Sequence, residues 1–92
     1  MAHIVFVNPK DNIKFEEVKR VITTISGSYC ALNMYCWCLY SGLESKTIRN
    51  KLSRTRIFKK IAVFALTGYW ATDGFDKEMN NWLKNYVEPD DD

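Results

Sequence analysis

The stretch Lys60–Val87, KIAVFALTGYWATDGFDKEMNNWLKNYV, carries the clearest structural pattern of the chain. It begins with a nearly continuous apolar run, Ile61–Leu66, which is typical of a strand covered on both faces. Turn signals follow at Thr67-Gly68 and Asp73-Gly74. Asp76 then takes an N-cap position, and apolar residues recur at helical spacing on one face: Met79, Trp82, Leu83 and Tyr86. The stretch therefore predicts a central strand and a helix that folds back over the sheet.

The preceding residues predict further strands and helices. Ile4–Val7 is expected to be an interior strand, because Asn8-Pro9 must end it. Lys14–Ser26 has the apolar spacing of a helix, with one face formed by Phe15, Val18, Ile22 and Ile25. Ser28–Ser41 is rich in β-favouring residues around a turn near Asn33-Met34, which indicates a hairpin. Leu43–Thr55 is predicted to be a second helix with a thin apolar stripe of Leu43, Ile48 and Leu52.

The order of these elements predicts an α+β domain with a ferredoxin-like βαββαβ sandwich and an appended C-terminal helix. In this interpretation the first and last strands lie centrally and parallel, and the hairpin strands flank them. Residues 1–87 form the single domain, and residues 88–92 form an acidic flexible tail. Because both faces of the hairpin strand Tyr35–Tyr40 are apolar, the second face is expected to pack on another copy, giving a homodimer.

Composition limits the class of protein. Of the 92 residues 47% are hydrophobic and 14% aromatic, which indicates a folded globule. No run approaches the roughly 20 apolar residues of a membrane span, and no export signal is evident, so we expect a cytoplasmic protein. The cysteines Cys30, Cys36 and Cys38 are then reduced, and their spacing favours buried small hydrophobes over a zinc site. His3, without an acid or nucleophile beside it, is expected to be solvated.

Charge is concentrated in one segment. Between Leu43 and Lys60 the chain has a single acidic residue, Glu44, and seven cations: Lys46, Arg49, Lys51, Arg54, Arg56, Lys59 and Lys60. Such a segment suits the phosphate backbone of duplex DNA or RNA, or an acidic protein surface. An ordinary solvated helix face is the equally weighted alternative. Because no aromatic residues interleave with these cations, the sequence predicts phosphate contacts rather than a stacking platform.

Two longer motifs resemble a known family. WCLYSGLESKTIRNKL at Trp37–Leu52 and VFALTGYWATDGFDKEMNNWLK at Val63–Lys84 resemble the small stand-alone proteins related to CRISPR-associated protein 2. That group includes SinR-family members and, more distantly, the virulence-associated VapD ribonucleases. The matching residues are packing and turn residues, so the resemblance implies the ferredoxin-like fold and a homodimer more than an activity.

The resemblance also implies where chemistry would reside. The family's metal-dependent nucleases use an aspartate at the end of the first strand, one from each protomer, and the matching position here is Asn8. A neutral amide is a weak ligand for Mg²⁺, so no catalytic residue, metal or cofactor is expected. Asp11 is the one carboxylate near enough in sequence to replace the missing aspartate, and its usual role would be in a turn.

These observations favour a homodimeric, catalytically silent nucleic-acid-binding protein related to CRISPR-adaptation nucleases, without a membrane association. The alternative is a protein-binding inhibitor or regulator from a phage or mobile element, acting on a host defence or nucleic-acid enzyme. Tyr69 and Trp70 are its candidate protein contacts, although the pair is also typical of a local packing cluster, and the resemblance at Gly68 and Trp70 favours that packing role. A metal-dependent ribonuclease that relies on Asp11 is the third hypothesis.

Overall fold

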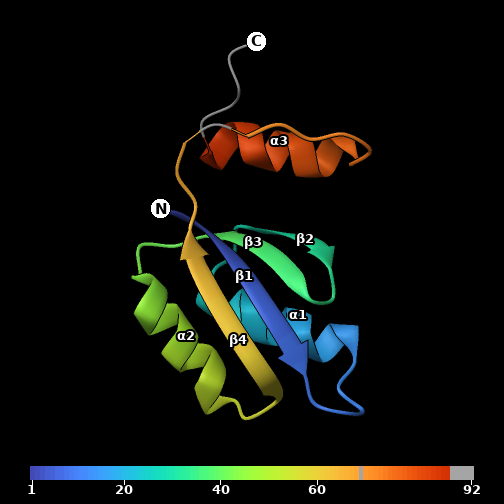
Figure 1. Ribbon diagram of the computed structural model, residues 1–92, viewed down its shortest axis with the longest axis vertical. Helices are drawn as coiled ribbons and strands as arrows, with labels where there is room; N and C mark the ends of the chain where they lie inside the picture. Colours follow the sequence, from blue (N-terminus) through green and yellow to red (C-terminus); the bar gives the residue numbers. More distant parts are fainter. Residues whose placement is uncertain (69, 88–92) are drawn as a thin grey trace.

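The computed structural model describes residues 1–68 and 70–87 as an α+β structure with a four-stranded antiparallel sheet and three helices (Figure 1). The elements follow the predicted order: β1 (Ala2–Pro9), α1 (Phe15–Ile25), β2 (Tyr29–Asn33), β3 (Cys36–Tyr40), α2 (Ser45–Arg54), β4 (Phe58–Ala65) and α3 (Lys77–Tyr86). The predicted acidic tail, 88–92, lies outside the described residues. Of the helices described, none is long and apolar enough to cross a bilayer.

The order of the strands differs from the prediction. The sheet runs β2-β3-β1-β4, and every neighbouring pair is antiparallel. β1 lies centrally, as expected, but β4 is an edge strand and pairs antiparallel to β1. The expectation that the last strand lies centrally and parallel to the first is therefore wrong, whereas the antiparallel sheet with its helices remains compatible with a ferredoxin-like fold. The physical reason lies in burial: residues Cys36–Leu39 of β3 are all buried, whereas the apolar run of β4 is only half covered.

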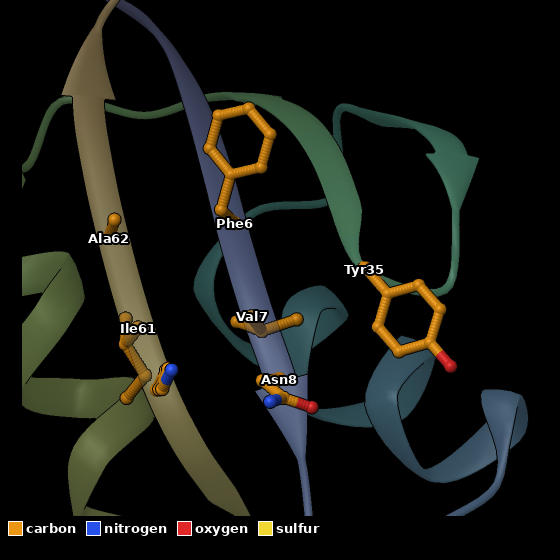
Figure 2. Close-up of a pocket in the computed structure, with 7 residues that line it drawn as sticks. Phe6, Val7, Asn8, Tyr35, Ile61 and Ala62 are labelled. Carbon is orange, nitrogen blue, oxygen red and sulfur yellow. The ribbon is translucent and has the colours of Figure 1, made fainter.

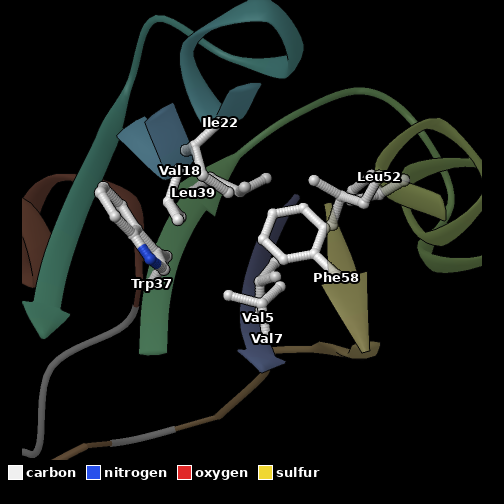
Figure 3. Close-up of a cluster of buried hydrophobic side chains, with 9 residues drawn as sticks. Val5, Val7, Val18, Ile22, Trp37, Leu39, Leu52 and Phe58 are labelled. Atoms are coloured by element: carbon white, nitrogen blue, oxygen red, sulfur yellow. The ribbon is translucent and has the colours of Figure 1, made fainter. Parts of the chain in front are cut away.

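The main core lies between one face of the sheet and helices α1 and α2 (Figure 3). Val5 and Val7 point into it from β1, and Trp37 and Leu39 point into it from β3. The helices contribute the residues predicted from their apolar stripes: Val18, Ile22, Ile48 and Leu52. We call this side of the sheet the helix-covered face.

The opposite face of the sheet is covered only in part. A second cluster packs α3 against β2, β3 and the start of β1, and consists of Ala2, Cys30, Cys38, Met79, Trp82, Leu83 and Val87. Asp76 caps α3 as predicted, because its carboxylate accepts a hydrogen bond from the Met79 backbone N–H at 2.9 Å. Figure 1 shows α3 lying across one end of the sheet. The remainder of this face is left open.

His3 occupies a different environment from the one expected. It is 1% exposed on β1, between Leu39 of β3 and Ala65 of β4, so the prediction of a solvated side chain is wrong. Its Nδ1 has no hydrogen-bond partner among the described residues. Burial lowers the pKa of His3 below its usual value, and the nearby N-terminal charge lowers it further, against a smaller opposing effect of a hydrogen bond to the Met1 backbone.

The lowered pKa predicts how stability depends on pH. In the unfolded chain His3 has a pKa of about 6.5 and binds a proton below that pH, whereas in the folded chain its lowered pKa keeps it neutral. Acid therefore favours unfolding. The free energy of unfolding should fall between pH 8 and pH 5.5, and the decrease should be smaller in His3→Leu. Urea titrations at several pH values measure both profiles. Parallel profiles for the two proteins would contradict the assignment.

Candidate nucleic-acid interface

The predicted basic residues of α2 are distributed over the side of the helix that faces away from the sheet. Ile48 and Leu52 are fully buried and fix which side of the helix faces the sheet. With 3.6 residues per turn, Lys46 and Arg54 then point away from the core, while Arg49 and Lys51 flank it on either side. All four are exposed. The helix therefore presents a convex basic surface rather than a single stripe of charge.

Arg56 extends this surface from an unfavourable backbone conformation. It follows the C-cap residue Thr55 of α2 and has a φ of 62°, in the left-handed region that favours glycine at this position of a helix end. Its backbone N–H donates to the Ser53 carbonyl at 3.1 Å, which closes the last turn. An arginine here costs about 1 kcal/mol relative to a residue suited to that conformation. The sequence nevertheless places an exposed cation there.

Lys59 and Lys60 are adjacent in sequence but differ in surroundings. Asn8 pairs with Lys60 and Pro9 pairs with Phe58, so the register shifts at this point and Lys59 is the additional residue on β4. Lys59 Nζ forms an ion pair with Asp11 at 3.0 Å. Lys60 lies beside Asn8 on the face of the sheet opposite to α2. The seven predicted cations are thus exposed but are divided between the two faces.

Asn8 and Asp11 line one shallow depression together with Lys10 and Lys59. The carboxylate of Asp11 is 89% exposed and is held by the Lys59 ammonium. Two lysines beside one carboxylate and one amide form a poor donor set for Mg²⁺, which requires carboxylates and water. Within residues 1–68 and 70–87 no group of three or more His, Cys, Asp or Glu side chains could hold a metal ion.

The three cysteines lie together on the sheet, as predicted. Cys30 is paired with Cys38 across β2 and β3, and Cys36 lies two residues before Cys38. All three are free and buried, and the Cys30 Sγ lies 3.3 Å from the Met79 Sδ of α3. Burial raises the pKa of each thiol, and raises that of Cys38 to about 12, where the neighbouring Cys36 and Cys30 add to the effect. They pack as small apolar groups.

The two candidate protein contacts cannot be treated alike. Tyr69 lies outside the described residues. Trp70 is half-buried and packs against the cluster beneath α3, and its indole N–H donates to the Val87 carbonyl at 3.2 Å. In this position Trp70 connects the loop after β4 to the end of α3, which is the packing role that the sequence offered as its alternative.

A group of exposed side chains on the uncovered part of the sheet was not predicted. Registered pairs place Phe6 opposite Ala62, and Asn8 opposite Lys60. Tyr35 joins them from the β2–β3 turn rather than continuing the side of Trp37 and Leu39 (Figure 2). We call this set the open patch, which consists of Phe6, Asn8, Tyr35, Lys60, Ala62 and Phe64. All of these residues except Phe64 line a groove of about 620 Å³.

The open patch has only a weak sequence signal. Phe6, Tyr35 and Phe64 are far apart in the chain, and each lies in an apolar run that reads as core. The one available sign is that the apolar residues outnumber the positions that two helices and a partial third can cover.

No protein-family model, curated protein or solved structure matches the chain.

The buried cysteines give a test of the sheet assignment. At pH 8 a thiol with a pKa of about 12 has so little thiolate that Cys38 should be alkylated on the order of a thousandfold more slowly than in the unfolded chain. Cys30 and Cys36 should also be protected. Timed iodoacetamide labelling with mass spectrometry, in buffer and in denaturant, measures each rate. Labelling of Cys38 at the unfolded rate in native buffer would exclude its buried position.

Proposed function

We propose that this chain is a catalytically silent nucleic-acid-binding protein that contacts phosphates through the basic surface of α2 and the turn after it. The observation that carries the proposal is the exposure of Lys46, Arg49, Lys51, Arg54 and Arg56 along α2 and the turn after it. Among the described residues the ion pair Lys59–Asp11 is the one salt bridge, so the side chains on α2 and its turn have no carboxylate to neutralise them.

The chemistry of these side chains suits phosphate. Arginine guanidinium groups bind phosphate oxygens through two parallel N–H donors, and lysine adds mobile positive charge. A convex helix with such groups fits the backbone of duplex DNA or RNA, with little preference for base sequence. The strained arginine at position 56 supports this proposal, because an unfavourable conformation is kept where a cation extends the surface.

We propose that the chain is related to the stand-alone relatives of CRISPR-associated protein 2. It would then form a homodimer and have the ferredoxin-like arrangement. The element order and antiparallel sheet are compatible with that arrangement. Two features near the end of β1 support a protein without nuclease activity. Asn8 is neutral, and the nearby carboxylate of Asp11 is paired with Lys59, so two free carboxylates are not available to hold a metal ion. An acidic surface of a host defence protein is the alternative ligand for the same cations.

Charge reversal on α2 tests the proposal. Arg49→Glu combined with Arg54→Glu should weaken binding of a labelled duplex at least tenfold at low salt, because two phosphate contacts become repulsive. The slope of log K against log salt should decrease in magnitude by about 1.8, the value for two contacts on a duplex. Fluorescence anisotropy titrations at several salt concentrations measure both quantities.

A matched control separates the surface from net charge. Lys77→Glu combined with Lys84→Glu makes the same change of charge on α3, where both lysines are exposed. This control should retain most of the affinity. Equal losses in the two double variants would refute a specific surface on α2, and a wild-type chain that binds no nucleic acid at low salt would favour the acidic protein partner.

Arg56→Gly tests the cost of the strained arginine. Glycine adopts positive φ readily, so the free energy of unfolding should not fall and should rise by up to about 1 kcal/mol. Duplex affinity should fall, because a cation is removed from the interface. Urea unfolding and anisotropy on the same preparations measure the two effects. If the variant is less stable than the wild type, or binds duplex as tightly, then Arg56 does not lower the stability of the fold while raising its affinity for duplex.

A further inference from the structure

We infer that the open patch binds single-stranded nucleic acid by stacking its bases on Phe6, Phe64 and Tyr35. This goes beyond the proposed function, because the patch lies on the opposite face of the sheet from α2 and has a different chemistry. The sequence alone predicted no stacking platform, since its cations and aromatic residues do not alternate along the chain. The sheet brings them together instead.

The aromatic side chains of the open patch are exposed on rigid elements. Phe6 on the central strand β1 is 45% exposed, and Phe64 on β4 and Tyr35 in the β2–β3 turn are each 55% exposed. The rings of Phe6 and Phe64 meet edge to face, with centroids 6.1 Å apart and an angle of 81° between the ring planes. The turn is fixed because the Tyr35 N–H donates to the Asn33 side-chain oxygen at 2.7 Å. The contact between the Phe6 and Phe64 rings and the fixed backbone at Tyr35 lower the entropy that is lost when a flat ligand binds.

The polar groups of the open patch suit the other parts of a nucleotide. Lys60 and Asn8 form a registered pair beside the rings, and both line the groove of about 620 Å³. The Lys60 ammonium can pair with a phosphate, and the Asn8 amide offers both a donor and an acceptor to the edge of a base. A groove of this size lies in the range of small-molecule sites. The six residues thus provide stacking, charge and hydrogen bonding within one surface.

A single strand fits these groups better than the other possible occupants. In a duplex the faces of the bases are already stacked on each other, so the rings of the patch would find no partner. A second copy of the chain placed on the open patch would bury Lys60 against an apolar surface, and the open patch contains no carboxylate to pair with it. The proposed homodimer is therefore expected to use another surface. Burying an unpaired ammonium is costly. The ligand that supplies flat aromatic faces and negative charge together is a single-stranded nucleic acid.

The experiment replaces the rings but keeps the apolar surface. Phe6→Leu combined with Phe64→Leu removes two of the three stacking rings and leaves Tyr35, and leucine at these exposed positions leaves the core intact. Binding to labelled 12-nucleotide oligo(U) RNA and oligo(dT) DNA should weaken by about tenfold or more, because base stacking on aromatic rings contributes strongly to single-strand affinity. Phe75→Leu is the control, since Phe75 is 46% exposed but lies in the segment before α3, outside the open patch. It should retain wild-type affinity.

Further measurements separate stacking from general attraction. Lys60→Gln should decrease the salt slope for a single strand by about 0.7 in magnitude, the value for one phosphate contact. Titration with the oligonucleotide should shift the ring proton resonances of Phe6 and Phe64 upfield, as expected for rings stacked on bases. Circular dichroism and thermal unfolding of each variant confirm that the fold is kept.

The outcomes distinguish this inference from the proposed function. Loss of single-strand binding in the ring variants, with duplex binding unchanged, supports the open patch whatever Arg49→Glu and Arg54→Glu do. Unchanged single-strand affinity, or no single-strand binding by the wild type, overturns the inference. It is also overturned if the wild type is a dimer by light scattering at the titration concentration and Phe6→Glu with Phe64→Glu makes it a monomer, because a second copy then covers the patch.

Discussion

The alternation of side chains along β1 determines what each face of the domain can do. This strand is hydrogen-bonded on both sides, to β3 and β4, and successive side chains point to opposite faces. Val5 and Val7 pack into the core with the helices, so Phe6 and Asn8 must point the other way. A shift of one residue in register would bury the Asn8 amide and expose both valines. The same burial that stabilises the core therefore fixes the composition of the open patch.

Helix α3 covers only one part of the outer face of the sheet. Beneath α3 the sheet presents small groups, Ala2, Cys30 and Cys38, on which Met79 and Trp82 can pack closely. Both ends of the helical segment are held, by the Asp76 cap at the start and by the hydrogen bond from Trp70 to Val87 at the end. Towards β4 the side chains become large aromatic rings. The ring of Tyr40 on β3 still contacts Tyr86 of α3, with centroids 5.0 Å apart, whereas Phe6 and Phe64 contact each other. The outer face is thus divided into a covered part and an exposed part.

Local patterns in the sequence were sufficient to predict the buried side of each helix and the start of α3, but not the position of each strand in the sheet. Helical spacing identified Val18, Ile22, Ile48 and Leu52 as buried, and a single carboxylate at position 76 was enough to mark the start of α3. The place of a strand in the sheet depends instead on pairing partners that lie far away in the chain. The run Ile61–Leu66 looked central, but in the structure Cys36–Leu39 is the fully buried run. His3 was misjudged for the same reason, because it lies on a central strand and pairs with Leu39 and Ala65, which are both far away in the chain.

The irregular pairing at Pro9 connects the two surfaces. Proline has no N–H to continue the ladder, and the pairing resumes with Phe58 opposite Pro9 after one additional residue, Lys59. The extra residue returns Phe58 to the helix-covered face, where it joins the core, while Lys60 keeps its place among the outer side chains. Lys59 is left free to reach Asp11. Without this irregularity strict alternation would put Phe58 on the same face as Lys60 and remove it from the core. The edge strand β4 therefore supports the core and supplies a cation to the open patch because its pairing with β1 is interrupted at one point.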